Sequence, residues 1–193
     1  MNVAVILAAG ESRRMGRPKQ LLPFGDKTML QCVVDAFTIP QVNETLVVLG
    51  YKADQIQRTL RDVTTVLNPH FARGMFSTVQ AGLDALPKKT KLVLLALCDQ
   101  PRLKRSTVQN LVETFQRDKH KILVPSIHGR QGHPLLFSAR YVKEILAMDE
   151  SLTLKHFLAN HPDELARLVV DDEGVLVDID DRAAYERELG RHA

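Results

Sequence analysis

The sequence predicts an α/β protein, a three-layer α/β/α sandwich around a Rossmann-like, mostly parallel sheet. Two observations carry this prediction. Short apolar runs alternate with segments of helical spacing from the start of the chain to Pro125. The first run, Val3–Ala8, and the most apolar one, Leu92–Leu97, lack the alternation of a half-exposed strand. Continuous apolar runs of this length are typical of parallel strands that are buried on both faces.

The elements of this first part follow from the spacing of the apolar residues. Besides the two runs already named, strands are expected at Thr45–Leu49, Val63–Leu67 and Ile122–Pro125. Helices are expected where apolar residues recur every three or four positions, at Thr28–Phe37, Asp54–Leu60, Ser77–Leu86 and Ser106–Phe115. Thr28 suits the N-cap of the first helix, and Pro87 follows the end of the third.

The alternation of strands and helices breaks after Pro125. The elements expected there are a loop at Gly129–His133, a strand at Pro134–Phe137, and helices at Arg140–Met148 and Leu152–Asn160. Leu165–Val170 and Val175–Asp178 flank an Asp-Asp-Glu-Gly turn and predict a hairpin. A closing helix is expected at Asp181–Leu189, with Asp180 or Asp181 as its cap.

Length and charge set the outer limits. A chain of 193 residues that is 45% hydrophobic can bury one sizeable core, so we expect a single domain over residues 1–193. Residues 1–161 carry 22 Lys/Arg against 13 Asp/Glu, whereas residues 162–193 carry 4 against 10. A basic body suits an anionic substrate, and an acidic tail could help to hold a metal ion. Solvated surface explains both charge clusters equally well.

The composition argues against several classes of protein. Trp is absent and aromatic residues are 5%, which gives little support to a stacking platform for single-stranded nucleic acid. No apolar run is long enough for a transmembrane helix. The N-terminal apolar run has no basic segment before it and is interpreted as a strand, not a signal peptide. Cys32 and Cys98 are expected to be a reduced pair in a cytoplasmic protein.

The loop after the first strand, LAAGESRRMGRPKQLLPFG, is the first place to look for a site, because ligands of open α/β sheets bind beyond the carboxyl ends of the strands. Gly10 and Gly16 allow close backbone approach, and Ser12, Arg13, Arg14, Arg17 and Lys19 add donors and positive charge. Neither the P-loop nor the dinucleotide fingerprint is present. The loop therefore predicts phosphate binding of another kind; a long basic surface connection is the alternative.

This string resembles the signature of the molybdopterin nucleotidyltransferase-like family, and most closely its molybdenum cofactor cytidylyltransferase branch. Sugar-phosphate nucleotidyltransferases are more distant relatives. The resemblance continues in NPHFARGMFSTVQAGL at 68–83, CDQP at 98–101, GHPLLF at 132–137 and DIDDRAAYE at 178–186. It implies a fold of the nucleotide-diphospho-sugar transferase type and a single nucleotidyltransferase domain.

The resemblance also implies residue roles at the nucleotide. Leu7, Ala8, Ala9 and Gly10 would wrap the base and ribose through the main chain. Ser12 and Arg14 would hold phosphates, and Lys19 would stabilise the charge on the leaving pyrophosphate. Lys19, Arg14 and Asp99 are thus the expected catalytic residues. A second nucleotide-facing loop would contribute Asn68, Gly74, Met75 and Ser77, for which a mobile structural loop is the alternative.

The metal and the acceptor follow in the same way. Asp99 directly follows the most apolar strand, and its match in the family is a ligand of Mg²⁺. Asp180 is the expected second ligand, with Asp178 and a capping role left open. Gly132, His133 and Pro134 match a segment on the acceptor side of relatives. Arg73, Arg102 and Arg130 are weaker candidates for contact with an anionic pterin.

The implied reaction transfers CMP from CTP to the terminal phosphate of molybdopterin and releases pyrophosphate. Guanylyltransferase relatives typically carry Gly where this chain has Ala9, which favours CTP over GTP. Three alternatives stay open: a guanylyltransferase, another transferase with a different phosphorylated acceptor, and a non-catalytic carrier of molybdenum cofactor to a hydroxylase or dehydrogenase. The resemblance also allows a molybdoenzyme partner, whereas neither nucleic acid nor a membrane is expected as a partner.

Overall fold

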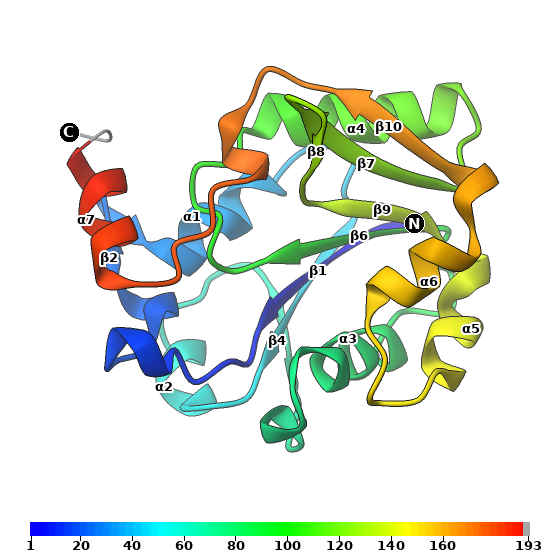
Figure 1. Cartoon of the computed structure of the whole chain (residues 1–193). Coiled ribbons are helices and arrows are strands. Elements are labelled where there is room, and N and C mark those ends of the chain that lie inside the picture. The colour runs from blue at the N-terminus through cyan, green and yellow to red at the C-terminus, as the bar shows by residue number, and fades with distance from the viewer. Residues whose placement is uncertain (191–193) are drawn as a thin grey trace.

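The centre of the molecule is a sheet of eight strands in the order β10-β7-β9-β6-β1-β4-β5, with β8 paired to β7 (Figure 1). The computed structural model describes residues 1–190. The strands are β1 (Asn2–Ala8), β4 (Glu44–Leu49), β5 (Thr64–Leu67), β6 (Leu92–Leu97), β7 (Ile122–Ile127), β8 (Arg130–Gln131), β9 (Leu135–Ser138) and β10 (Leu165–Val169). Within this sheet only β8 and β9 run against the other described strands. The predicted mostly parallel sheet is confirmed.

Helices cover both faces of this sheet. The first face carries α1 (Met29–Ala36), α2 (Ala53–Gln57) and α4 (Arg105–Arg117), and the second carries α3 (Met75–Asp84), α5 (Val142–Ala147) and α6 (Leu154–Asn160) (Figure 1). Side chains of β1 alternate between the two cores, Ala4 and Ile6 toward the first and Val3 and Val5 toward the second. Alternation of this kind follows from the pleat of a strand. The three-layer α/β/α sandwich is confirmed.

A third, smaller core ties the C-terminal segment to the first loop. Leu22, Phe24, Met29, Ile179 and Tyr185 pack together there. They come from a short hairpin, β2 (Pro23–Phe24) with β3 (Lys27–Thr28), from α1, and from α7 (Arg182–Gly190) with the residues before it. The hairpin was not expected from the sequence. Its packing fixes the position of residues 178–181 relative to the loop after β1.

Two of the proposed helix caps can now be assigned. The Thr28 side chain accepts a hydrogen bond from the backbone N–H of Gln31 at 3.2 Å, so the expected N-cap of α1 is confirmed. At the start of α7, Asp181 accepts from the N–H of Ala184 at 2.7 Å. Asp181 is therefore the cap of this helix, and Asp180 is left to make other contacts.

The hairpin expected around residues 171–174 is wrong. β10 is present, but Glu173–Val175 forms a 3-10 turn and residues 176–180 form neither strand nor helix. Their backbone groups bond elsewhere: Val175 O accepts from the N–H of His133 at 3.0 Å, and the N–H of Ile179 donates to Asp99 O at 2.9 Å. The segment is thus held by loops at the carboxyl edge of the sheet and cannot pair with β10.

The remaining differences are small. The range 129–133, expected to be a loop, contains β8, and α2 ends at Gln57, short of the expected Leu60. Both cysteines are free thiols. Among residues 1–190, no helix combines the length and the apolar character needed to cross a lipid bilayer.

Candidate active site

The loop after β1 and the residue after β6 meet at one edge of the sheet, because β1 and β6 are parallel neighbours. Leu7 lies opposite Leu97, and the N–H of Cys98 donates to Leu7 O at 3.2 Å. Asp99 therefore lies beside the beginning of the loop formed by residues 9–25. This is the carboxyl edge of the sheet, where the ligands of open α/β folds bind.

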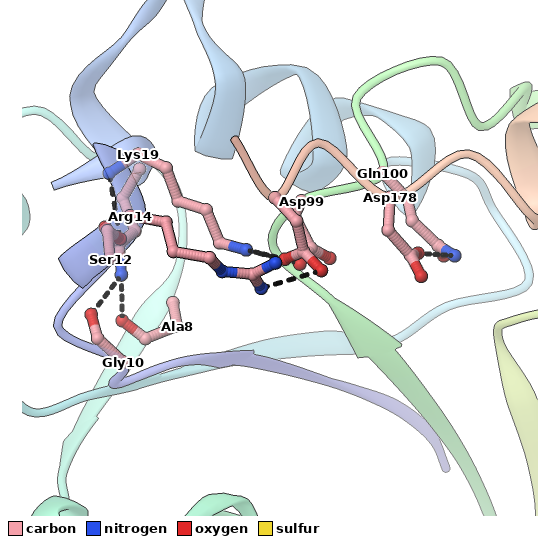
Figure 2. A network of polar contacts seen from close by, with 10 residues as sticks. Ala8, Gly10, Ser12, Arg14, Lys19, Asp99, Gln100 and Asp178 are labelled. Carbon is pink, nitrogen blue, oxygen red and sulfur yellow. Dashed lines mark hydrogen bonds and ion pairs between the residues drawn. The ribbon is translucent and has the colours of Figure 1, made fainter. Parts of the chain in front are cut away.

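Lys19 lies between two carboxylates in this position. Its ammonium group is 2.5 Å from Asp99 Oδ2 and 2.9 Å from Asp180 Oδ1 (Figure 2). Arg14 contacts the other oxygen of Asp180 at 3.0 Å. The side chains of Lys19 and Asp99 are 15% and 13% exposed, so their ion pair is largely shielded from water. The structure thus brings together four residues that the sequence predicted to act together.

The charges of this group depend on one another. Burial alone would lower the pKa of Lys19, but the charge of Asp99 and the hydrogen bonds that Lys19 donates to both carboxylates outweigh burial and raise it. The hydrogen bond from Lys19 holds the pKa of Asp180 below its usual range. Both groups are therefore charged at neutral pH.

The loop that carries Lys19 folds back on itself in two short 3-10 turns, Arg13–Met15 and Lys19–Leu21. Ser12 and Gly16 have positive φ angles of 56° and 66°, and the side chain of Ser12 accepts from the N–H of Lys19 at 3.1 Å. Ser12 therefore shapes the loop through this bond. In this structure its hydroxyl also lies 3.4 Å from the side-chain oxygen of Gln20.

Gln20 is a residue whose importance the sequence reasoning missed. Its side chain is completely buried, and its amide nitrogen donates to Ala8 O at 2.8 Å and Gly10 O at 3.0 Å (Figure 2). A buried amide that bonds carbonyls on both sides of residue 9 fixes the direction of the backbone there. The available signal was its position directly after Lys19, but nothing in the sequence shows that the side chain turns inward.

Replacing Gln20 with leucine removes both of these hydrogen bonds and puts an apolar side chain of similar size in place of the amide. We expect the protein to lose about 1–3 kcal/mol of unfolding free energy and the KM for nucleotide to rise at least tenfold, with a smaller change in kcat. Thr107→Val is the matched control. Thr107 is also a buried side-chain donor, to Asp172, but neither residue belongs to the first loop or lines its pocket. An equal loss of stability in both variants, without a change in KM for Gln20→Leu, would contradict this role.

The second predicted loop, residues 68–78, is held by hydrogen bonds between its own residues. The buried amide of Asn68 donates to the hydroxyls of Ser77 and Thr78 at 3.0 and 3.1 Å, and its oxygen accepts from the N–H of His70 at 2.9 Å. Gly74 has a φ of 109°, which other residues rarely adopt. Asn68 and Ser77 thus support the loop, and their roles at the nucleotide stay predictions.

A pocket of about 220 Å³ lies between the two loops. It is lined by the carboxyl ends of β1 and β6, by the first loop and by the start of α3: Leu7, Ala9, Gly10, Lys19, Gln20, Phe71, Gly74, Met75, Thr78, Leu97, Cys98 and Asp99. Seven predicted site residues line it, namely Leu7, Ala9, Gly10, Lys19, Gly74, Met75 and Asp99. Ala8 contributes its carbonyl to Gln20, whereas Arg14 contacts Asp180.

The segment predicted to face the acceptor lies beside this pocket. Gly132 passes so close to Val175 that a Cβ atom there would lie 2.2 Å from the Val175 carbonyl oxygen. His133 and Gly132 line a second cavity, whereas Pro134 is buried and does not. Burial lowers the pKa of His133, although the charge of Asp99 acts in the opposite direction. The ring of His133 is therefore neutral at physiological pH.

The three arginines considered for pterin binding are elsewhere. Arg73 pairs with Glu150 at 2.9 Å, and Arg102 pairs with Glu188 at 3.0 Å. Arg130 is exposed on β8 and does not line the second cavity. None of the three lines either pocket, and their contact with a pterin stays a prediction.

Comparison with known proteins identifies the family to which a chain with this site belongs. Residues 4–165 match the MobA-like NTP transferase domain. The chain belongs to this family. It is 32% identical over 143 residues to nicotine blue oxidoreductase of Paenarthrobacter nicotinovorans, which covers 70% of each protein. It is 27% identical over 137 residues to molybdenum cofactor cytidylyltransferase of Escherichia coli K12, covering 69% of this chain and 68% of that protein.

The crystal structure of Rv0371c from Mycobacterium tuberculosis H37Rv superposes with a TM-score of 0.84 at 26% identity, over 98% of this chain and 97% of that one. A complex of Rv0371c with manganese superposes with a TM-score of 0.80 at 23% identity, over 98% of each chain. The family resemblance and the nucleotidyltransferase type of fold are thus confirmed.

The carboxylates of this MobA-like NTP transferase suit a divalent cation in one specific respect. Asp99 Oδ1 is buried and has no hydrogen-bond partner within residues 1–190. A buried carboxylate oxygen without a donor needs a cation or a water molecule. The described residues contain no group of three or more metal-binding side chains. Mg²⁺ fits such a site, since it binds through one or two carboxylates and completes its shell with phosphate oxygens and water.

Gln100 is the other residue of the transferase that sequence reasoning missed. Its buried amide donates to Asp178 Oδ1 at 2.8 Å and lies 3.2 Å from Val175 O (Figure 2). Burial, followed by the nearby charge of Asp99, raises the pKa of Asp178. Asp178 and Asp180 therefore have different partners: a neutral amide for the first, and Lys19 with Arg14 for the second. No strand forms at residues 176–180, so strand pleating does not hold these two carboxylates on one face.

Proposed function

We propose that this chain is a nucleotidyltransferase of one domain that moves CMP from CTP to the terminal phosphate of molybdopterin, with Mg²⁺ and with release of pyrophosphate. The observation that carries the proposal is the largely shielded Lys19–Asp99 ion pair that lines the 220 Å³ pocket. The expected domain spans residues 1–193, of which 191–193 lie outside the described part. The cytoplasmic location stays a prediction.

The geometry suits transfer by positioning and charge neutralisation. The acceptor phosphate is already anionic, so the reaction needs no general base. Lys19 donates to the phosphates, and Gln20 fixes the backbone at residues 8–10. A cation bound at Asp99 would supply further neutralisation of phosphate charge. Burial raises the pKa of Cys98 to about 12, which keeps its thiol protonated and excludes it as a nucleophile.

Two rivals differ from this proposal in what they require of the site. A carrier of molybdenum cofactor needs neither a buried ammonium nor a carboxylate oxygen without a donor, so the Lys19–Asp99 pair speaks against it. A transferase with another acceptor needs the same pair and differs only in the second cavity. The similarity to molybdenum cofactor cytidylyltransferase supports the pterin as acceptor.

The proposal is tested by measuring pyrophosphate release with Mg²⁺ for each pairing of CTP, GTP and ATP with molybdopterin or a sugar phosphate. Release with CTP and molybdopterin alone is the expected result. Release with a sugar phosphate but not with molybdopterin would mean that the acceptor is a sugar phosphate. Binding of molybdopterin without consumption of any nucleotide would favour the carrier. One relative is named nicotine blue oxidoreductase, so the same panel includes a redox-active heterocycle. A colour change of this compound without consumption of nucleotide would mean that the protein is an oxidoreductase and not a nucleotidyltransferase.

The choice of base is predicted to depend on Ala9. Ala9 lines the nucleotide pocket and is 2% exposed, and its carbonyl is bonded by the N–H of Tyr51 at 3.0 Å. Its methyl group would crowd a purine against this fixed backbone. We expect kcat/KM for CTP to exceed kcat/KM for GTP at least tenfold. In Ala9→Gly, the ratio of these two values should decrease, because the methyl group is gone. GTP turnover that equals or exceeds CTP turnover in the unmodified protein would refute this.

A further inference from the structure

Two segments lie side by side at the carboxyl edge of the sheet: the loop after β6 and residues 174–180, which we call the C-terminal strap. At one end of the strap, a Cβ atom on Gly174 would lie 2.5 Å from the Arg102 carbonyl oxygen. Near the other end, the N–H of Ile179 donates to Asp99 O at 2.9 Å. Residue numbers rise along the strap as they fall along the loop, so the two segments run antiparallel and in close contact.

Gln100 joins the strap to this loop between those two ends. It is 2% exposed, and its amide nitrogen lies 3.2 Å from the Val175 carbonyl oxygen, to which it donates. The same nitrogen donates to Asp178 Oδ1 at 2.8 Å (Figure 2). The Val175 carbonyl also accepts from the N–H of His133 at 3.0 Å. One buried amide therefore contacts the strap both beside the segment predicted to face the acceptor and next to the C-terminal carboxylates.

The oxygen of this amide has no such contacts. Gln100 Oε1 is buried and accepts no hydrogen bond within residues 1–190. A buried polar atom without a partner lowers stability, whereas an apolar side chain of the same size would avoid that cost. Filling of space therefore does not explain an amide at this position, but two directed hydrogen bonds to the strap do.

The far end of the strap carries Asp180. Its carboxylate lies 2.9 Å from the Lys19 ammonium, and Ile179 before it is completely buried in the small third core. These contacts keep the strap attached to the molecule, but they leave residues 176–178, which form no regular secondary structure, to be held by Gln100. A displacement of about 1 Å in a group that positions a reaction can cost about 100-fold in rate.

We propose that Gln100 is a positioning residue of the reaction, whose amide sets the place of Asp180 opposite Lys19 and Asp99 by holding the strap. The inference rests on the proposed nucleotidyl transfer, in which Asp180 is the second metal ligand. Gln100 does not line the nucleotide pocket. Its loss should therefore lower kcat and the affinity for the cation, and it should leave the KM for CTP almost unchanged.

Gln100→Met tests this role, because it keeps the length of the side chain and removes both hydrogen bonds. We expect kcat for pyrophosphate release to fall at least tenfold, the KM for CTP to change less than threefold, and the affinity for Mn²⁺ alone to weaken at least fivefold. Gln100→Glu, which sets a carboxylate opposite two acceptors, should be impaired at least as much and serves if Gln100→Met does not fold.

Thr107→Val is the matched control for this variant. Thr107 is another buried donor, and its hydroxyl lies 2.6 Å from Asp172, two residues before the strap and eight before Asp180. The melting temperature should fall in both Thr107→Val and Gln100→Met, but Thr107→Val should keep kcat and Mn²⁺ affinity within twofold. Equal losses of kcat in the two variants would mean that Gln100 contributes only to stability.

A double-mutant cycle with Asp180→Asn shows whether Gln100 acts through Asp180. If it does, Gln100→Met should slow Asp180→Asn no further, because the group that it displaces has already lost its charge. Additive losses of kcat, or an unchanged kcat in Gln100→Met, would overturn the inference.

The same cycle on Mn²⁺ affinity separates this inference from the proposed function. If no nucleotide is consumed by the unmodified protein, non-additive losses of Mn²⁺ affinity would keep the positioning role and refute nucleotidyl transfer. Additive or unchanged affinities in that case would refute both.

Discussion

Lys19→Ala should lower kcat for pyrophosphate release by more than tenfold, which corresponds to about 1.4 kcal/mol of transition-state stabilisation. Lys19 is the ammonium that lies in the pocket, 2.5 Å from Asp99, and its low exposure makes each of its electrostatic contacts stronger than on the surface. Without it, Asp99 and Asp180 would repel the triphosphate. The measurement is steady-state release of pyrophosphate with saturating CTP.

Two further variants separate catalysis from folding. Lys19→Met keeps the apolar stem of the side chain and removes the charge, so it should lose activity to the same extent with less effect on packing. Lys27→Ala is the control, since Lys27 also pairs with a carboxylate at 2.5 Å, Asp35, but on the exposed surface. Its removal should leave kcat within about twofold, because exposed ion pairs contribute little. Kinetics that are unchanged in Lys19→Ala would remove this residue from the mechanism.

Asp99→Ala should abolish magnesium-dependent turnover while the protein remains folded. Asp99 Oδ1 is a buried oxygen that has no hydrogen-bond partner among residues 1–190, and Asp99 lies just after the end of the central strand β6. Lys19 keeps Asp180 as a partner in this variant, so no cation is left buried and unpaired. The readouts are turnover against Mg²⁺ concentration, binding of Mn²⁺ followed by electron paramagnetic resonance, and the melting temperature.

Isosteric variants at the C-terminal carboxylates decide which of them assists Asp99. Asp178→Asn and Asp180→Asn are each compared with Asp99→Asn for Mn²⁺ affinity. If only Asp180→Asn loses Mn²⁺ affinity, Asp180 is the second metal ligand, as the sequence predicts. If only Asp178→Asn loses Mn²⁺ affinity, the second ligand is Asp178, the residue that Gln100 contacts. Full magnesium-dependent activity of Asp99→Ala would mean that the cation is held elsewhere.

Many elements of the fold could be predicted because their signals are local. The apolar runs of β1 and β6 are buried on both faces, so each residue in the run is constrained in the same way and the pattern is unbroken. Thr28 caps α1 through a hydrogen bond that spans three residues. The hairpin predicted after Leu165–Val170 failed for the opposite reason, since the bonds of Val175 and Ile179 run to residues more than 40 positions away.

In the candidate site, too, the residues with local signals could be predicted and those that depend on distant contacts could not. The loop residues Gly10, Ser12 and Lys19 are predictable because one continuous string carries the whole signature. The inward direction of Gln20 is decided by the carbonyl groups of Ala8 and Gly10, whose orientation depends on the strand β1 before them. Asn68 and Ser77 illustrate the same difficulty, because a polar side chain gives no sign of whether it faces a ligand or its own loop.

By itself, the sequence determined the α/β class, the order of the main elements, the family and the position of the loop that is predicted to bind phosphate. The tertiary structure alone decided that Asp180 lies against Lys19, 161 positions away, and that Asp178 bonds Gln100 instead. The physical reason is that contacts between distant segments depend on the packing of whole elements, here the small core around Ile179, and no local pattern of residues encodes that packing.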